Sequence, residues 1–533
     1  MSTTLVNPEH NYLFPYSSSA SNNAAATSVP TSTAGESNNT NPTPTSVDTN
    51  VSSNSSICQK PRKASPNWTE FYKNGYPKEI IVISDDEDED DEIVITNTSP
   101  AKSLVNDNNK RLLSRPPSPP HKKLRSKFPV VSYKPTTERV LKSSIIRVPL
   151  VRSYSPVLPN TDPAKTTPSC DDANGHLVIE DSTTLANGRF VIGKVLGQGT
   201  FGKVVSAFDK IKRKVCAVKI IRAIPKYREA SKIELRVLST IARYDPENQN
   251  RCIHLLECFD YKNHICIVMD LFGMSIFDFL ESNHYIPFPR SHIKSFAKQL
   301  FSSVAYLHGL NLVHTDLKPE NILLKSNNSY SEPLENHTKH KTRLVLEDTT
   351  IHLIDFGSAI FNDEYHSSVV STRHYRAPEV ILGIGWSFPC DIWSIGCILV
   401  EFCTGEALFP TYDDLEHLAL MQRVFGKSIE RYILHSASQN KIGAELLNKT
   451  TGKINYPNVN TKKKSEKHVK STKSLRQTLK NVRPWLVDGA TTGDVAEEQF
   501  WTDLLDLLER IFVYDPEKRI TAEEALRHGF LNH

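Results

Sequence analysis

The first 58 of the 533 residues contain no lysine and no arginine, and they are mainly Ser, Thr, Asn, Ala and Pro. A segment with so few large apolar side chains cannot bury enough surface to offset its ordering entropy. The low-complexity character continues, with charged patches, to about residue 185. We therefore expect a disordered Ser/Thr/Asn/Pro-rich tail over residues 1–185 and a folded region after it.

Three further absences exclude other classes of protein. No apolar run reaches about 18 residues and the N-terminus lacks a basic-then-apolar signal, so neither a membrane helix nor secretion is expected. The nine cysteines include no CxxC pair, and Cys216, Cys266 and Cys397 lie in apolar runs, which favours buried reduced thiols. The net charge of +4 is too small to indicate direct nucleic-acid binding. We expect an intracellular, soluble monomer.

Two short motifs in the second half of the chain carry reactive side chains. HTDLKPEN places Asp316 and Asn321 five residues apart, and IDFGSA follows with Asp355. One Asp that orients a hydroxyl, with an Asn and a second Asp that bind Mg²⁺, is the set that phosphoryl transfer from ATP requires. In this order the motifs resemble those of protein kinases. Lys318 then resembles the Ser/Thr-kinase lysine that neutralises the γ-phosphate, so Asp316 and Lys318 are predicted to be catalytic.

A glycine-rich stretch near the start of the folded region predicts a nucleotide site. Glycines let the backbone approach phosphates because they carry no Cβ. A Rossmann turn uses the same GxGxxG letters, but it runs from strand to helix, whereas here VVSAF continues as a strand. The predicted ATP-binding residues of this stretch are Leu196, Gly197, Gln198, Gly199, Thr200, Phe201, Gly202, Lys203 and Val204.

The next apolar strand, VCAVKII, contains Lys219, which is expected to grip the α- and β-phosphates of ATP. A buried lysine needs an anionic partner, and Glu234 in the following helix can supply it. The apolar run ICIVMDLFG predicts a strand that leaves the small lobe. By resemblance, Met269 would lie behind the adenine pocket, and Asp270 and Phe272 would belong to the hinge that bonds adenine. A buried core strand would have the same sequence pattern.

The ordered motifs predict a two-lobed protein-kinase fold of the α+β class over residues 189–533. A small β-rich lobe is expected over about 189–270, and a large, mainly helical lobe over about 274–533.

Two stretches are insertions relative to a minimal kinase, at 325–350 and 435–494. The second contains the lysine-rich run at 461–473. The run could dock acidic or phosphorylated substrates, but charge runs are usually solvated, and we expect a partly disordered loop.

The activation segment follows Asp355. By family resemblance, Thr372 should bond near Asp316, and Glu379 should form a buried ion pair with Arg519. Most kinases have Arg immediately before the catalytic Asp, where it contacts a phosphate on the activation segment, but this chain has Thr315. We therefore predict substantial activity without phosphorylation by an upstream kinase.

The stretch STRHYRAPEVILGIGWSFPCDIWSIGCILVE, with HTDLKPENIL and KYREASKIE, resembles the LAMMER (CDC2-like) kinases of the CMGC group. The resemblance covers about residues 189–533. The family's EHLAMMERILG reads EHLALMQRVFG at 416–426, so Leu420 and Gln422 depart from the pattern. The resemblance implies Ser/Thr phosphorylation, tyrosine autophosphorylation and Arg/Ser-rich, RNA-processing substrates. The Asn- and Ser-rich tail is compatible with a fungal source.

Two alternatives differ from this interpretation. A DYRK-type or other CMGC kinase stays open because of the altered EHLALMQRVFG stretch. A pseudokinase scaffold is disfavoured, because scaffolds usually lose one of the groups that Lys219, Asp316 and Asp355 represent.

Two patches in the tail predict partners. The aliphatic residues Ile80, Ile81, Val82 and Ile83 run into an acidic block, which resembles a SUMO-interacting motif; a solvated acidic tail has the same composition. Residues 110–127 contain two basic clusters that resemble a bipartite nuclear-localisation signal for an import receptor, or a basic linker. Nuclear and cytoplasmic localisation is the expectation.

Overall fold

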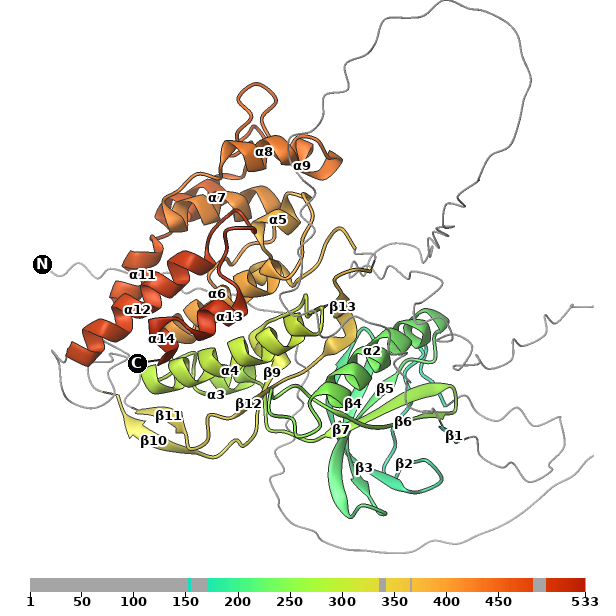
Figure 1. Cartoon of the computed structure of the whole chain (residues 1–533). Coiled ribbons are helices and arrows are strands. Elements are labelled where there is room, and N and C mark those ends of the chain that lie inside the picture. Colours follow the sequence, from blue (N-terminus) through green and yellow to red (C-terminus); the bar gives the residue numbers. More distant parts are fainter. Residues whose placement is uncertain (1–151, 155–169, 335–341, 365–366, 483–494, 533) are drawn as a thin grey trace, which may run out of the picture. The chain divides into compact units, whose positions relative to one another are not determined.

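The computed structural model describes residues 152–154, 170–334, 342–364, 367–482 and 495–532. The chain divides into two units, Met1–Ser65 and Pro66–His533, and every described residue belongs to the second. A β-rich lobe comes first and a mainly helical lobe follows, coloured from yellow-green to red (Figure 1). The predicted two-lobed α+β fold is confirmed.

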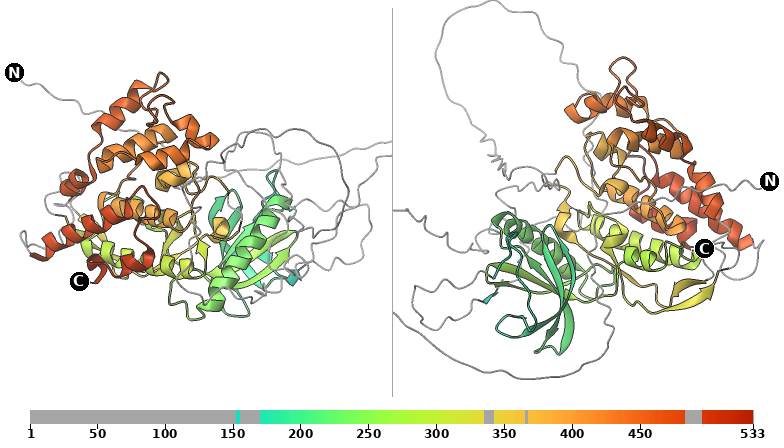
Figure 2. Two further views of the ribbon diagram at one scale, coloured as in Figure 1. Left: turned by 45° about the horizontal axis from the view of Figure 1, so that its top comes forward. Right: turned by 180° about the vertical axis from the view of Figure 1, so that it is seen from behind.

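The small lobe is a seven-stranded sheet with the strand order β1-β6-β7-β5-β4-β3-β2. Its long helix α2 (Pro225–Tyr244) lies against the sheet in Figures 1 and 2. Leu235, Leu238 and Ile241 recur at helical spacing and are buried in the core, which explains why this amphipathic segment packs there. The strands are β1 (Arg152–Tyr154), β2 (Thr184–Leu185), β3 (Phe190–Gly199), β4 (Gly202–Asp209), β5 (Lys214–Ile221), β6 (Leu255–Tyr261) and β7 (His264–Asp270).

The folded region begins earlier than predicted. Residues 170–185 were expected in the disordered tail, yet Leu177 and Leu185 are buried in the small-lobe core. The backbone of Gly175 accepts a hydrogen bond of 2.8 Å from Ala223, next to the start of α2. Strand β1 also lies within the predicted tail and pairs in parallel with β6. The tail prediction is wrong here because isolated apolar residues in a polar stretch show no periodicity.

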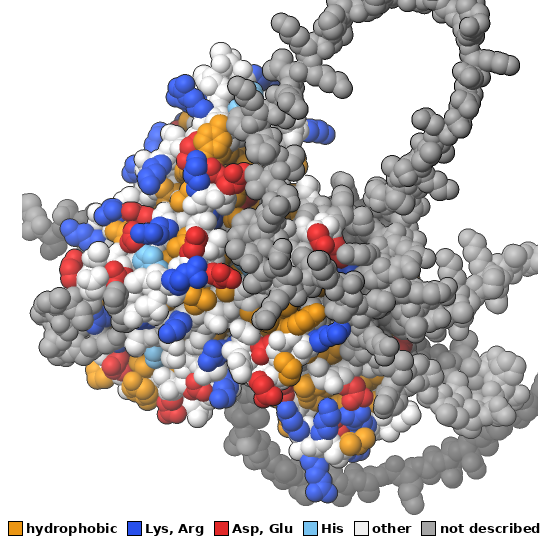
Figure 3. Space-filling view, viewed as in Figure 1, with side chains coloured by type: hydrophobic (Ala, Val, Ile, Leu, Met, Phe, Trp, Pro, Cys, Tyr) orange, Lys and Arg blue, Asp and Glu red, His pale blue; other side chains and the backbone are white. Residues whose placement is uncertain are grey.

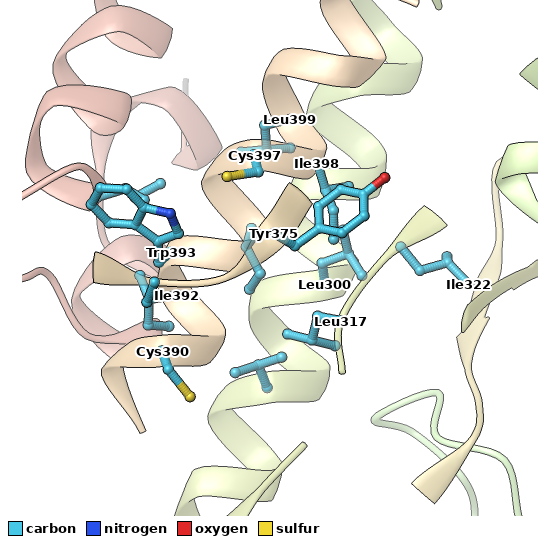
Figure 4. Packing of buried hydrophobic residues seen from close by; sticks show 14 of the residues in the cluster. Leu300, Leu317, Ile322, Tyr375, Cys390, Ile392, Trp393, Cys397, Ile398 and Leu399 are labelled. Atoms are coloured by element: carbon cyan, nitrogen blue, oxygen red, sulfur yellow. The ribbon is translucent and has the colours of Figure 1, made fainter. Parts of the chain in front are cut away.

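The large lobe is organised around α6 (Pro389–Thr404), which is buried along almost its whole length. Figure 4 shows Trp393, Ile392 and Cys397 of α6 among the aliphatic side chains of neighbouring elements. The other helices are α3 (Ile276–Ser282), α4 (Arg290–Gly309), α5 (Pro378–Ile381), α7 (Asp414–Phe425), α8 (Arg431–Ala437), α9 (Lys441–Leu446), α10 (Lys463–Ser471), α11 (Leu475–Val482), α12 (Val495–Ile511), α13 (Ala522–Leu526) and α14 (Gly529–Asn532).

Short two-stranded sheets carry the loops of the large lobe. β8 pairs with β13 and β9 pairs with β12, while β10 and β11 form a hairpin inside the first insertion. These strands are β8 (Leu312–Val313), β9 (Ile322–Leu324), β10 (Ser329–Pro333), β11 (Thr342–Leu346), β12 (Ile351–Leu353) and β13 (Ile360–Phe361).

The lysine-rich run forms helix α10, so the expected loop is wrong for this stretch. His468 of α10 lies 2.8 Å from a carboxylate oxygen of Glu416 in α7, and Val469 packs against the core. Arg423 of α7 donates a 2.9 Å bond to the backbone oxygen of Thr472. One side of the helix is therefore held by α7, and the lysines are on the exposed side.

The burial of the cysteines and the mixed charge of the surface agree with what the composition indicates. The eight cysteines that the structure describes are free, and seven of them are buried, as expected; Cys58 lies outside the described residues. On the visible face, lysine and arginine side chains are interspersed with acidic ones (Figure 3). Among the described helices, none has the length and apolar character needed to cross a membrane.

Candidate active site

The glycine-rich residues form the turn between β3 and β4. Gly197 lies opposite Val204, Gln198 opposite Lys203, and Gly199 opposite Gly202. A Cβ at Gly202 would lie 2.1 Å from the backbone oxygen of Ile220, so only glycine fits there.

The side chains of this loop do not all point the same way. The ring of Phe201 packs edge-on against Tyr227, with 5.8 Å between ring centroids. The ammonium of Lys203 donates to the backbone oxygen of Leu177 at 3.1 Å, so its charge is bound by the segment that precedes the sheet. Leu196 is exposed. The loop thus offers mainly backbone groups to a nucleotide.

Three charged side chains that are far apart in the sequence contact one another in the interior next to the glycine-rich loop. The ammonium of Lys219 in β5 lies 2.7 Å from Glu234 in α2 and 3.0 Å from Asp355 in the DFG triplet. The predicted contact of Lys219 with Glu234 is confirmed. Burial alone would lower the pKa of Lys219, but Asp355 and Glu234 outweigh it and hold that pKa above its ordinary value.

The acid of the DFG triplet is strongly ionised. The ammonium of Lys219 lowers the pKa of Asp355 to about 2, against the opposing effect of burial. A Cβ at Gly357 would lie 3.3 Å from Asp355 Oδ1, so glycine keeps open the space beside this carboxylate.

The catalytic loop holds Asp316 in a network of donors. Thr372 donates its hydroxyl at 2.6 Å and its backbone N–H at 3.0 Å to Asp316 Oδ1, which confirms the predicted contact. Lys318 Nζ lies 2.9 Å from Asp316 Oδ2 and donates to the hydroxyl of Thr372 at 3.0 Å. Burial would raise the pKa of Asp316, but Lys318 and Thr372 outweigh it and the pKa is lowered. Asp316 is therefore an acceptor at neutral pH.

The amide of Asn321 has a defined orientation. Its Nδ2 donates 2.8 Å to the backbone oxygen of Asp316, which leaves Oδ1 as the atom available to a cation.

A buried carboxylate in α6 fixes the catalytic loop. Asp391 accepts the backbone N–H groups of His314 and Thr315, both at 2.9 Å. Thr315 has a φ of 69°, in the left-handed region that is strained for a residue with a branched Cβ. The two bonds hold that strained backbone in place. The sequence alone assigned no role to Asp391, because nothing near it in the chain indicates which backbone groups its carboxylate meets.

The residues predicted for the adenine pocket and the hinge lie at the end of β7 and just after it. Met269 and Asp270 are the last two residues of the strand, and Met269 is buried; Phe272 follows the strand. The carboxylate of Asp270 pairs with Lys214, and the ring of Phe272 stacks on His352 with 3.9 Å between centroids.

A group of carboxylates that sequence analysis did not identify lies near Asp316. The hydroxyl of Tyr375 donates 2.7 Å to Glu401 in α6, and Figure 4 shows that hydroxyl pointing away from the apolar side chains. Burial, and to a lesser degree Glu320, raises the pKa of Glu401 to about 7. Burial also raises the pKa of Glu320, and Asp316 and Asp278 of α3 add to it. Burial and the charge of a neighbouring carboxylate thus act in the same direction on the pKa of both Glu320 and Glu401.

The predicted ion pair of the large lobe is also present. Arg519 donates to both carboxylate oxygens of Glu379, at 2.6 and 2.8 Å, and both side chains are fully buried. It joins the end of the activation segment to the segment before α13.

Comparison with known proteins places these features in a family. The family described as protein kinase domain matches residues 190–531. The dual specificity protein kinase lkh1 of Schizosaccharomyces pombe is 49% identical over 412 residues, which cover 77% of this chain and 54% of lkh1. The chain thus spans about half the length of that relative.

Two further matches cover most of the protein compared. The serine/threonine-protein kinase AFC3 of Arabidopsis thaliana is 43% identical over 364 residues, which are 68% of this chain and 86% of AFC3. A crystal structure of a kinase domain matches with a TM-score of 0.60 and 34% identity, over 68% of this chain and 100% of the other. Together with the site, these matches show that the chain belongs to the protein kinase family and, within it, to the LAMMER (CDC2-like) kinases.

Proposed function

We propose that the protein is an active dual-specificity kinase that transfers the γ-phosphate of ATP to serine and threonine of protein substrates and autophosphorylates on tyrosine. The observation that carries this proposal is the complete set of charged contacts at the site. Lys219 is bound by Glu234 and Asp355, and Asp316 is bound by Lys318 and Thr372. A scaffold that had lost catalysis would have no need to keep both networks.

Mg²⁺ fits the residues that would hold it. Oδ1 of Asn321 and the ionised carboxylate of Asp355 are the hard oxygen ligands that Mg²⁺ prefers, and Gly357 leaves room beside Asp355. When bound, Mg²⁺ neutralises charge on the nucleotide phosphates. Asp316 accepts and orients the hydroxyl of the substrate, while Lys318 offers a positive charge to the transferred group.

Arginine-rich substrates fit the carboxylates beside the catalytic loop. The charge of Glu320 raises the pKa of Glu401, and the charges of Asp316 and Asp278 raise that of Glu320, so these carboxylates act on one another. A guanidinium pairs with carboxylates through two parallel hydrogen bonds. A peptide with arginine beside its acceptor serine would relieve the repulsion among these acids. This supports Arg/Ser-rich, RNA-processing proteins as the substrate class.

The test is a peptide-array assay with purified full-length protein, ATP and Mg²⁺. Asp316→Asn is the inactive control, and Glu320→Gln is the specificity variant. We expect Arg/Ser-rich peptides to be preferred by the wild type, with the preference for arginine reduced in Glu320→Gln. Phosphorylation of a different motif would support kinase activity but contradict the Arg/Ser-rich substrate class, and it would favour a DYRK-type or other CMGC specificity. No signal above Asp316→Asn would favour a scaffold.

The tail supports two further proposals, although residues 80–83 and 110–127 lie outside the described part of the chain. We propose that the aliphatic residues 80–83 bind SUMO and that residues 110–127 bind an import receptor, which would place the protein in both nucleus and cytoplasm. An NMR titration with SUMO that shifts no resonance of 80–83 would contradict the first. Unchanged nuclear entry after Lys122→Ala and Lys123→Ala would contradict the second.

A further inference from the structure

A second charged residue of α2 joins the activation segment. Arg236 Nη2 donates to both carboxylate oxygens of Glu364, with 2.6 Å to Oε1 and 2.5 Å to Oε2. The side chains of Arg236 and Glu364 are 4% and 13% exposed. The guanidinium carbon also lies 4.6 Å from the ring centroid of Phe361 in β13. The contact is a shielded ion pair between segments 128 residues apart in the chain.

Arg236 stands two residues after Glu234 on the same helix. Residues two apart on an α-helix project about 200° from each other around the axis. Glu234 therefore faces Lys219 and the nucleotide site, while Arg236 faces the start of the activation segment. Helix α2 is thus attached to the nucleotide site on one side and to the activation segment on the other.

The start of the activation segment is anchored on its other side as well. Asn311 donates its side-chain N–H to Asp363 at 2.8 Å and accepts the backbone N–H of Asn362 at 2.8 Å. Glu364 follows directly, so its carboxylate is presented to Arg236 from a fixed piece of backbone. Because the backbone before Glu364 is fixed, its carboxylate can restrain the position of α2; a carboxylate on an unattached segment would move together with the helix.

In most kinases the position before the catalytic Asp holds an arginine that binds a phosphate on the activation segment. In this chain the position holds Thr315. Its hydroxyl donates 2.9 Å to the backbone oxygen of Ser358, and it carries no positive charge. The segment nevertheless contacts α2 through a negative group, and that group is the permanent carboxylate of Glu364.

We infer that Glu364 is a positioning residue for phosphoryl transfer: it holds α2 through Arg236, so that Glu234 stays on Lys219 without phosphorylation of the activation segment. The inference rests on the proposed kinase activity. The carboxylate of Glu364 takes the part that an added phosphate plays in other kinases.

The experiment compares the wild type with Glu364→Gln, both full length and treated with phosphatase. We expect kcat to fall about tenfold or more, because the arrangement of Lys219 is needed for the transfer step, while the KM for an Arg/Ser-rich peptide stays the same. The matched control is Glu466→Gln, which neutralises a carboxylate whose ion pair with Lys470 lies exposed on α10, away from α2 and the activation segment. It should retain wild-type kcat.

Charge exchange separates positioning from general damage. The double variant Arg236→Glu with Glu364→Arg should have a higher kcat than either single variant, since it restores an ion pair of reversed polarity. Should Glu364→Gln not fold, Arg236→Gln tests the pair from the other side with the same expected loss.

Two outcomes would overturn the inference: wild-type kcat in Glu364→Gln and Arg236→Gln, or a charge-exchanged double variant no more active than its two single variants. Failure of the proposed function is distinguishable, because the wild type itself would then not exceed Asp316→Asn.

Discussion

Replacing Glu379 by glutamine removes the negative charge that Arg519 faces in the interior of the large lobe. Arg519 also donates to the backbone oxygen of Pro389 at 2.8 Å and to that of Val513 at 3.0 Å, and its guanidinium lies 5.0 Å from the ring centroid of Trp393. These groups would continue to hold the guanidinium in place. The variant therefore keeps a charged arginine buried without a counter-charge.

The expected cost follows from this environment. Breaking one side of a buried ion pair typically costs about 3–5 kcal/mol, because the remaining charge cannot reach water. The carbonyl acceptors that remain around Arg519 satisfy part of its hydrogen bonding, so we expect the lower end of that range, about 3 kcal/mol. That is a large share of a typical domain stability of about 5–15 kcal/mol.

The assay is equilibrium unfolding of the full-length protein in urea, followed by far-UV circular dichroism. The matched control is Glu466→Gln, which removes a carboxylate 3.1 Å from Lys470 in α10, where the two side chains are 33% and 76% exposed. Exposed pairs four residues apart on a helix contribute only about 0.3–0.5 kcal/mol. Equal losses in the two variants, or a loss below about 1 kcal/mol in Glu379→Gln, would refute the reasoning from burial.

Three further predictions concern catalysis. Lys219→Arg should nearly abolish turnover with an unchanged urea midpoint, because a planar guanidinium cannot replace the ammonium between Glu234 and Asp355; activity within about threefold of wild type would contradict this. Phosphatase-treated wild type should keep substantial activity in a radiometric peptide assay, because Thr315 carries no positive charge to pair with an activation-segment phosphate; complete inactivity would be the opposite result. Burial raises the pKa of Glu401 to about 7, so its carboxylate is neutral below that pH and charged above it. The kcat/KM of an arginine-containing peptide should therefore rise through pH 7 while that of its alanine counterpart stays flat, and parallel profiles would exclude Glu401 from arginine binding.

The sequence predicts those parts of the site whose residues are close together in the chain or follow in a fixed order. Asp316 and Asn321 belong to one loop, and their spacing alone indicates a base and a metal ligand. Lys219 lies among apolar neighbours in a strand, and that burial requires an acid, which the next helix provides. In each case the chemistry constrains residues that are close in sequence or follow one another in a fixed order of elements.

Local patterns were least informative where a charged stretch has one packed side. The lysine run was expected to be a loop because its composition is that of a solvated segment. It forms α10 because Val469 packs on the core and His468 contacts Glu416 of α7. The hydrophobic pattern of so short a segment does not predict these two contacts. A helix with one narrow apolar contact therefore looks like a loop until its partner is known.

The residues that tune the site belong to a different category, because their roles depend on pairs far apart in the chain. Glu364 is one acid in the sequence FNDEY, and Arg236 is one base on an amphipathic helix. Neither is distinguished by its neighbours from a solvated surface charge. Only the fold brings them together and shields them, and shielding makes the loss of one partner costly. Motifs can therefore identify the groups expected to contact ATP. The groups that hold those motifs in position are identified only from the three-dimensional structure.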